Sequence, residues 1–238
     1  MAAETDPAAS LRATLDLADW RRRISDLYAD VRRLAATDVD AALELWRSTR
    51  EELFREHPQS PVPADRRAAF RAHHFQADPG LRFEVPVVPD EARPDPPASG
   101  LSGLGGLGGL SGLGGAITMD LPVSAGGTMS FSRIGQVEIP FAAGPRRLGV
   151  YWMAGYAGGV FLPFRDATSG DETYAAGRYL LDTAKSADLG GDQERGSLIL
   201  DFNFAFQPSC AFDPKWACPL APPENRLDIP IRAGERLE

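Results

Sequence analysis

Apolar residues near the start of the chain recur at intervals of three or four positions, the spacing of an amphipathic helix. The pattern predicts a first helix from about Leu17 to Leu34, with an apolar stripe made of Trp20, Ile24, Leu27, Tyr28, Val31 and Leu34. A second helix is expected to begin at Asp38, because aspartate accepts hydrogen bonds from the free N–H groups of a helix start. Its inward side chains are Val39, Ala42, Leu43, Trp46, Leu53 and Phe54.

The segment HPQSPVP, residues 57–63, is expected to end this second helix, since proline cannot continue one. His57 is therefore interpreted as a helix C-cap. The Arg21–Arg23 run is interleaved with aspartates and is interpreted as a solvated helix face. His73 and His74 are expected to be surface or interface groups.

After the helices, the pattern changes to short apolar or alternating runs separated by glycine and proline, which is typical of strands joined by turns. Strands are expected near residues 81–88, 128–134, 136–142, 147–153, 159–164, 174–182, 197–206 and 226–232. Because no helical pattern lies between the later runs, they predict an antiparallel sandwich or partly closed barrel. The expected fold class is α+β, with the two N-terminal helices covering one face or end of a β-rich unit.

Glycine divides the chain at the same place, with none in residues 1–79 and all 24 between Gly80 and Gly234. Glycine is costly inside helices and useful in tight turns. We therefore expect a helical segment over residues 1–63 and a β-rich domain over residues 64–238.

Residues 89–115 are rich first in proline and then in glycine, leucine and serine, so they are expected to form a flexible loop. Within them, Gly103–Gly108 matches the G-x-G-x-x-G pattern of dinucleotide-binding loops. That fingerprint requires a preceding strand and a following helix. Here a proline-rich stretch precedes the glycines and ITMDLP follows them, so the match is interpreted as a product of the repeat.

Charge and composition exclude several classes of protein. The 25 Lys and Arg residues against 33 Asp and Glu give a net charge of −8, which argues against generic nucleic-acid binding. No apolar run is long enough to span a membrane, and the acidic N-terminal residues do not resemble a signal peptide. We expect a cytoplasmic protein with no membrane partner.

The two cysteines, Cys210 and Cys218, are separated by seven residues in a proline-rich loop. This spacing is not the C-x-x-C of zinc knuckles or thioredoxin-like motifs, and the histidines lie far away in sequence. We expect no metal site and no cofactor. The spacing leaves open whether the cysteines are reduced thiols or a disulfide.

Candidate chemistry lies on the polar side of the last strands. In LDFNFAF, residues 200–206, alternation places Leu200 and the three phenylalanines in the core and turns Asp201 and Asn203 the other way. Arg178 lies on the strand 174–182, and Arg165 precedes a turn that contains Thr168. If these strands are neighbours, the two arginines, Asp201 and Asn203 converge, and guanidinium groups suit a carboxylate or phosphate.

The leading hypothesis is therefore a small-molecule-binding domain with a polar, anion-accepting pocket. Arg165 and Arg178 would contact a small polar or anionic ligand, Asp201 and Asn203 would orient it, and Tyr174 and Thr168 would line the site. One alternative is an enzyme that uses Asp201 or Tyr174 as acid or base. Another is a protein-interaction module that uses the proline-rich turns. A structural alternative makes Arg178–Asp201 an ion pair and Asp166 the cap of its own turn.

Several longer motifs in the C-terminal half resemble a known family. They include FLPFRDATSG at residues 161–170, LDFN at 200–203, PSCAF at 208–212 and PPEN at 222–225. They are similar to an uncharacterised bacterial and archaeal family, domain of unknown function 1684, and with an upstream segment, Trp46–Pro61, they extend the resemblance over about residues 40–236. The resemblance implies no activity, but its motifs coincide with the polar strand positions.

Overall fold

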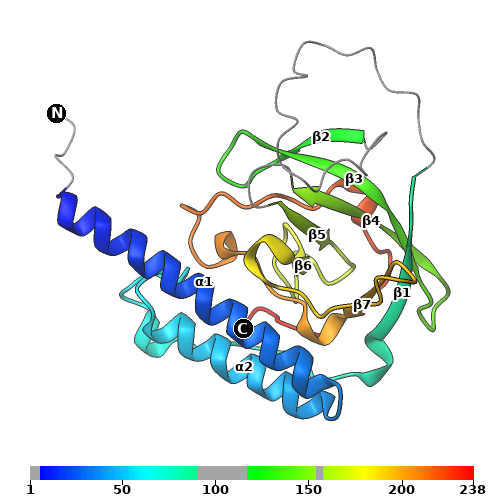
Figure 1. Cartoon of the computed structure of the whole chain (residues 1–238), viewed down its shortest axis with the longest axis horizontal. Coiled ribbons are helices and arrows are strands. Elements are labelled where there is room, and N and C mark those ends of the chain that lie inside the picture. The colour runs from blue at the N-terminus through cyan, green and yellow to red at the C-terminus, as the bar shows by residue number, and fades with distance from the viewer. Residues whose placement is uncertain (1–5, 91–116, 154–157) are drawn as a thin grey trace.

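The computed structural model of the protein describes residues 6–90, 117–153 and 158–238 (Figure 1). Two helices come first, α1 (Pro7–Ala35) and α2 (Val39–Glu56). The described strands are β1 (Arg82–Val88), β2 (Ile117–Pro122), β3 (Thr128–Ile139), β4 (Arg146–Met153), β5 (Gly159–Phe164), β6 (Arg178–Asp182) and β7 (Ser197–Asp201). The predicted order, two helices followed by an antiparallel β-rich unit, is confirmed.

Helix α1 begins ten residues earlier than the apolar stripe predicted. Asp6 caps it by accepting a hydrogen bond from the Ala8 backbone N–H at 3.0 Å, and Pro7 occupies the first helical position. This first part of the helix is not held by an apolar stripe, since Leu11 and Leu15 are 60% and 59% exposed. The hydrophobic pattern therefore located only the part of α1 that packs on the protein.

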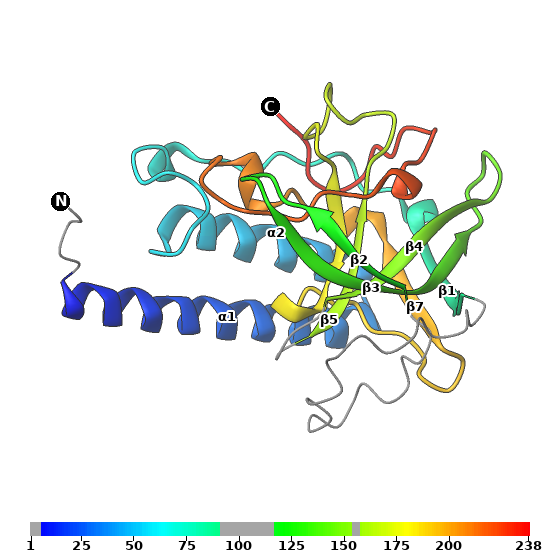
Figure 2. The same ribbon diagram turned by 90° about the horizontal axis from the view of Figure 1, so that it is seen from above.

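Helix α2 has the predicted limits. The Asp38 side chain accepts a hydrogen bond from the Ala41 backbone N–H at 2.9 Å, and His57 is the C-cap residue, as expected. The two helices lie side by side against the β unit, and the N-terminal half of α1 extends beyond it (Figures 1 and 2). Within the described ranges, no helix is long and apolar enough to cross a bilayer.

The strands pair antiparallel in the order β6-β5-β4-β3-β1-β7, and β2 pairs with the outer part of β3. The sheet is strongly curved, and it does not close into a complete barrel (Figure 1). Its two ends approach at one point, where the backbones of Tyr179 and Phe206 exchange hydrogen bonds of 2.9 and 3.0 Å. Strand β6 is thus hydrogen-bonded to β5 along one edge and to Phe206 on the other.

Two strand predictions are corrected in the middle of the chain. The runs 128–134 and 136–142 form one long strand, β3, whose register against β4 shifts between Arg133 and Gly135. Gly135 has φ +155°, and a Cβ there would overlap the Val88 carbonyl, so only glycine fits this bulge. Strand β2 was not predicted; it is held by six consecutive partners on β3.

The later strands are shorter than predicted. Residues 174–177 are turn rather than strand, and residues 226–232 contain no strand, only an isolated bridge from Arg226 to Arg165. Strand β7 ends at Asp201, because its side chain accepts a hydrogen bond from the Asn203 backbone N–H at 3.0 Å and starts a 3₁₀ turn. The expected alternation through Phe206 is therefore interrupted.

The buried apolar residues form two clusters on opposite sides of the sheet. One cluster joins the helices to the sheet and contains residues such as Trp46, Phe54 and Phe204. The other fills the curved interior and contains Leu148, Leu162 and Phe202, among others. The 3₁₀ turn after β7 thus sends consecutive phenylalanines into different clusters. A flexible loop was expected over residues 89–115. Its residues 91–115, which include the Gly103–Gly108 match, lie outside the described residues.

Candidate functional site

Arg178, at the start of β6, is buried with 1% of its surface exposed. One guanidinium nitrogen donates to the Ala233 and Glu235 carbonyl oxygens at 2.5 and 3.0 Å. The other donates to Asp166 Oδ2 and to the Ile231 carbonyl oxygen, both at 2.7 Å. Desolvation lowers the pKa of Arg178, and the charge of Asp166 opposes that shift. Both terminal nitrogens of the guanidinium group therefore already donate to acceptors within the protein.

Asp166 organises the turn that follows β5. Its Oδ1 accepts hydrogen bonds from the Thr168 backbone N–H at 2.8 Å and from the Thr168 hydroxyl at 2.5 Å. The Thr173 hydroxyl lies 2.9 Å from that of Thr168. The expectation that Asp166 caps its own turn is confirmed. The ion pair predicted for Arg178 is corrected: its partner is Asp166, not Asp201.

Asp201 and Asn203 belong to a second polar cluster at the end of β7. Asp201 is fully buried, and it accepts hydrogen bonds from Arg82 at 2.9 Å and from the Asn203 side-chain amide at 2.8 Å. The same amide donates to the Asp78 carbonyl oxygen, and its oxygen accepts from the Asp78 N–H, both at 2.8 Å. This cluster fastens the segment before β1 to the end of β7.

The remaining two predicted residues lie elsewhere. Arg165 is held through its backbone, which bonds to Asn225 and Leu227, and its buried Nε has no hydrogen-bond partner among the described residues. Tyr174 is partly buried beside Cys210, and desolvation raises the pKa of its hydroxyl to about 12.

The structure thus brings Arg178 together with Thr168, and Asp201 together with Asn203, in two separate networks. No hydrogen bond joins the two networks within the described residues. Each network is satisfied by protein groups, as buried charges require.

A cavity of about 240 Å³ lies between the helices and the β unit. None of the six predicted site residues lines it. Seven aromatic side chains contribute to its wall: Trp20, Tyr28, Trp46, Phe54, Tyr179, Phe206 and Trp216. They come from α1, α2, β6 and the segment after β7, so the cavity exists only because the helices pack against the sheet.

Arg50 of α2 forms the inner charged part of the wall. It donates two hydrogen bonds to the Glu235 carboxylate, at 2.5 and 3.3 Å, and both side chains are at least nine-tenths buried. The guanidinium group also lies over the rings of Phe54 and Phe206, 4.4 and 4.9 Å from their centroids. These contacts fix the orientation of the rings and leave the Arg50 charge compensated.

Cationic side chains stand at the mouth of the cavity. Arg21 and Lys185 line it and are exposed, and the nearby Asp182 carboxylate, 3.0 Å from Lys185, is buried. Desolvation and the charge of Arg21 both lower the pKa of Lys185, and Asp182 more than offsets them. Two cations therefore face one carboxylate at the cavity mouth. No hydrogen bond or ion pair involves Arg21 within the described part of the chain.

One residue of the cavity wall has an unmatched buried polar atom. Gln207 is 6% exposed and lines the cavity, and its Oε1 accepts no hydrogen bond from any described residue. Its amide nitrogen donates to the Arg236 carbonyl oxygen at 3.2 Å. An unsatisfied buried acceptor is uncommon in a folded protein and identifies a position where a donor is favourable.

Sequence reasoning missed this cavity because its residues carry no motif. Trp20 and Trp46 were correctly assigned to the inward helix faces, but periodicity cannot show that their rings leave space between two layers. The available signal was Arg21, which lies next to Trp20 at the edge of that face. It was grouped with Arg22 and Arg23, which bond to Asp19 at 3.1 and 2.8 Å and form the expected solvated face.

Comparison with known proteins places the β unit in a family. No curated protein matches the chain. Among solved structures, it is similar to the solution NMR structure of an uncharacterized protein from Haloarcula marismortui. The TM-score is 0.54 at 28% identity, and the likeness covers 83% of this chain and 94% of the other.

Residues 113–236 match the family described as a protein of unknown function, DUF1684. The match contains the Asp166 turn, Arg178, Asp201 and both cysteines. The upstream segment Trp46–Pro61, included in the resemblance on sequence, lies outside it. Because the match extends over more than half of the chain, the protein belongs to the DUF1684 family.

Proposed function

We propose that the protein binds a small molecule with an apolar, ring-containing body and one acidic group in the cavity between the helices and the β unit. The observation that carries the proposal is an aromatic cavity whose mouth holds two exposed cations, Arg21 and Lys185. Pockets of this kind, mostly apolar with a few placed polar groups, are the usual form of small-molecule sites.

The volume of the cavity sets the size of the ligand. An apolar cavity of about 150 Å³ admits benzene. The cavity of about 240 Å³ therefore suits a body of two fused rings. The rings in its wall, among them Trp20 and Phe206, offer faces and edges for stacking against such a body.

The charges at the mouth set the sign of the ligand. Arg21 and Lys185 repel each other, and Asp182 balances only one of them. A ligand carboxylate between the two cations relieves this repulsion. The expectation of an anion-accepting pocket is thereby retained, but the cations are different from those that the sequence indicated.

Isothermal titration calorimetry with 2-naphthoate tests the proposal, and the neutral 2-naphthamide serves as a matched probe. We expect 2-naphthoate to bind with one-to-one stoichiometry. It should bind about fivefold more tightly than the amide, since an exposed ion pair contributes up to about 1 kcal/mol. Raising the salt concentration should reduce this difference. Equal binding of the two probes, or no binding of either, contradicts the proposal.

Two leucines of α1 provide a matched pair of variants. Leu17 lines the cavity and Leu11 does not, although both are exposed, at 40% and 60%. Leu17→Glu places a carboxylate at the mouth and is expected to weaken 2-naphthoate binding at least severalfold. Leu11→Glu should leave binding unchanged. If the two variants behave alike, the probe does not occupy this cavity.

A further inference from the structure

A second concave region lies between the segment that follows α2 and the C-terminal residues, and we call it the C-terminal groove. Its volume is about 550 Å³. One side is formed by residues between 62 and 73, and the other by residues 207, 211 and 212 together with residues 235–238. In Figure 2 the cyan segment after α2 lies beside the orange segment after β7. Gln207 lines both this groove and the aromatic cavity, so the two are neighbours.

The two sides of the groove are joined by contacts between residues far apart in sequence. The His73 carbonyl oxygen accepts a hydrogen bond from the Arg236 backbone N–H at 2.9 Å. The rings of Phe70 and Phe212, one from each side, meet edge to face with their centroids 5.8 Å apart. Both rings also contact Phe54 of α2, at 5.6 and 5.1 Å. The apolar part of the groove wall is therefore held in place by the core.

Three arginines, Arg66, Arg71 and Arg236, line the groove. Each donates one side-chain hydrogen bond to a backbone carbonyl oxygen, at 2.7, 2.7 and 3.0 Å, and the acceptors are Phe212, Phe70 and Leu237, respectively. Each of these bonds uses one guanidinium nitrogen. The other two nitrogens of each group donate to no described residue, so they are available to a ligand.

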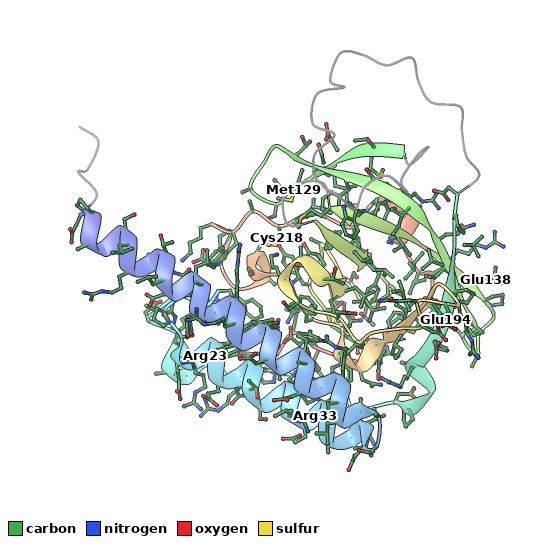
Figure 3. The ribbon with its side chains drawn as sticks, in the orientation of Figure 1. Arg23, Arg33, Met129, Glu138, Glu194 and Cys218 are labelled. Atoms are coloured by element: carbon green, nitrogen blue, oxygen red, sulfur yellow. The ribbon has the colours of Figure 1, made fainter. Side chains whose placement is uncertain are left out.

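The groove arginines differ from other arginines on the surface. Arg23 and Arg33, which Figure 3 labels on the helix pair, each bond to an aspartate about one turn earlier on α1, both at 2.8 Å. None of the three groove arginines forms an ion pair with a residue in the described ranges. Their positive charge is therefore not compensated by a direct contact with a carboxylate.

The carboxylates that line the groove do not cancel this charge. Glu235 is paired with Arg50. Glu238 is 91% exposed at its side chain and lies 3.8 Å from His73, and Asp65 is also exposed. Solvent screens exposed charges strongly. The groove thus combines an excess of cations with two aromatic rings.

We propose that the C-terminal groove binds a phosphate monoester whose alcohol part is an aromatic ring. The terminal phosphate oxygens accept hydrogen bonds from the guanidinium groups, which match such oxygens in pairs. The ring packs against Phe70 and Phe212. This site is separate from the aromatic cavity, and its ligand carries two negative charges near neutral pH rather than one.

Isothermal titration calorimetry with three probes tests the charge and the ring of the ligand. Phenyl phosphate should bind with one-to-one stoichiometry. Phenyl sulfate, which has the same ring and one negative charge, should bind at least about threefold more weakly, and inorganic phosphate, which has no ring, about tenfold more weakly. No binding of phenyl phosphate, or equal binding of phenyl phosphate and either of the other probes, overturns the proposal.

Substitutions of single arginines locate the phosphate. Arg71→Gln should weaken phenyl phosphate binding about threefold, and it breaks no long-range contact, because Arg71 bonds only to the carbonyl of the preceding residue. Arg236→Gln should weaken it about tenfold, since Arg236 is the less exposed of the two. The matched control is Arg226→Gln, which removes the same charge from an exposed position outside the groove. Equal losses in Arg71→Gln and Arg226→Gln overturn the assignment.

A competition experiment distinguishes this site from the aromatic cavity. Saturating 2-naphthoate should change the affinity for phenyl phosphate by less than about twofold, and so should Arg21→Gln, because Arg21 lines the cavity and not the groove. Displacement of phenyl phosphate by 2-naphthoate would place both probes in the cavity and overturn the proposal of a second site. The titrations with phenyl phosphate contain no naphthoate, so a failure of the proposed cavity ligand leaves their outcome readable.

Discussion

Two arginines, Arg178 and Arg21, show how differently the same side chain is used in the two parts of the molecule. Arg178 lies inside the β unit, where one carboxylate and three backbone carbonyls take its hydrogen bonds. Arg21 lies on α1 at the mouth of the helix–sheet cavity, exposed and beside another cation. The first lies within the residues that match the family, and the second lies outside them.

The comparison indicates that the polar motifs of the β unit serve the fold. The Arg178–Asp166 pair holds the turn after β5 to the start of β6, and the Asp201–Arg82 pair joins the paired ends of β7 and β1. A buried polar network satisfied by the protein has little capacity left for a ligand. The binding that we propose is located instead where two layers meet, beside the incompletely matched charges of Arg21 and Lys185.

The largest expected effect comes from Arg178→Leu. The substitution leaves the Asp166 carboxylate buried without its partner and removes the donor from three carbonyl oxygens. We expect a loss of about 3–5 kcal/mol in the free energy of unfolding, measured by urea denaturation. The double variant Arg178→Leu/Asp166→Asn should recover part of that loss. A stable Arg178→Leu protein that fails only to bind 2-naphthoate would instead make Arg178 a ligand residue.

A smaller loss is expected from Asp201→Asn in the second network. An amide keeps one acceptor but loses the charge that pairs with Arg82, so we expect a loss of about 2 kcal/mol in unfolding free energy. Binding of 2-naphthoate should be unchanged, because Asp201 does not line the cavity. Arg82→Gln should cost at least as much, because it leaves the fully buried Asp201 carboxylate without its charged partner. Weakened naphthoate binding in Asp201→Asn would contradict the separation of fold and cavity.

His74 gives the helix–sheet contact a pH dependence. Burial against α2 lowers its pKa from 6.5 to about 4, and its ring lies 5.7 Å from that of Trp46. Between these pH values the unfolded chain binds a proton that the folded chain does not. Stability should therefore fall by about 2 kcal/mol as the pH drops from 6.5 towards 4, and the contribution is complete above pH 6.5.

The check is urea denaturation across this pH range in two neighbouring variants. His74→Gln should flatten the pH dependence of the unfolding free energy. His73→Gln should retain it, because the His73 side chain is 44% exposed. If the His73 variant changes the slope and the His74 variant does not, the assignment is wrong.

The smallest effect belongs to the cavity mouth. Arg21→Gln should weaken 2-naphthoate binding by about fivefold, or about 1 kcal/mol, without changing stability. The matched control is Arg22→Gln, since Arg22 is the next residue, pairs with Asp19 and does not line the cavity. Calorimetry at low salt measures both. An equal loss in the two variants would show that only the overall charge matters.

The elements whose apolar residues recur at regular spacing could be predicted from the sequence. The stripe from Trp20 to Leu34 and the cap at Asp38 determine the packed helices, and alternation located most strands. Three features depend on contacts distant in sequence. They are the bulge at Gly135, which requires the Val88 carbonyl, the pairing of β2 with β3, and the end of β7 at Asp201.

The candidate site was less predictable for the same reason. Sequence reasoning recognised that Arg178, Asp166 and Asp201 are unusual, and it left open an ion pair or a ligand. It could not choose the partner, because Ala233 and Ile231, whose carbonyls surround Arg178, come from a C-terminal segment without regular structure. The cavity depends on the spacing of two layers, which no local pattern encodes.

The most direct test of the account locates the bound probe by isotope-edited NMR. Nuclear Overhauser effects from the ring protons of 2-naphthoate should reach the methyl groups of Ile24 and Ala187, which line the cavity. Effects to Leu227 and Ile231 instead, which pack in the interior of the β unit near Arg178, would contradict it and return the binding site to the motif arginines.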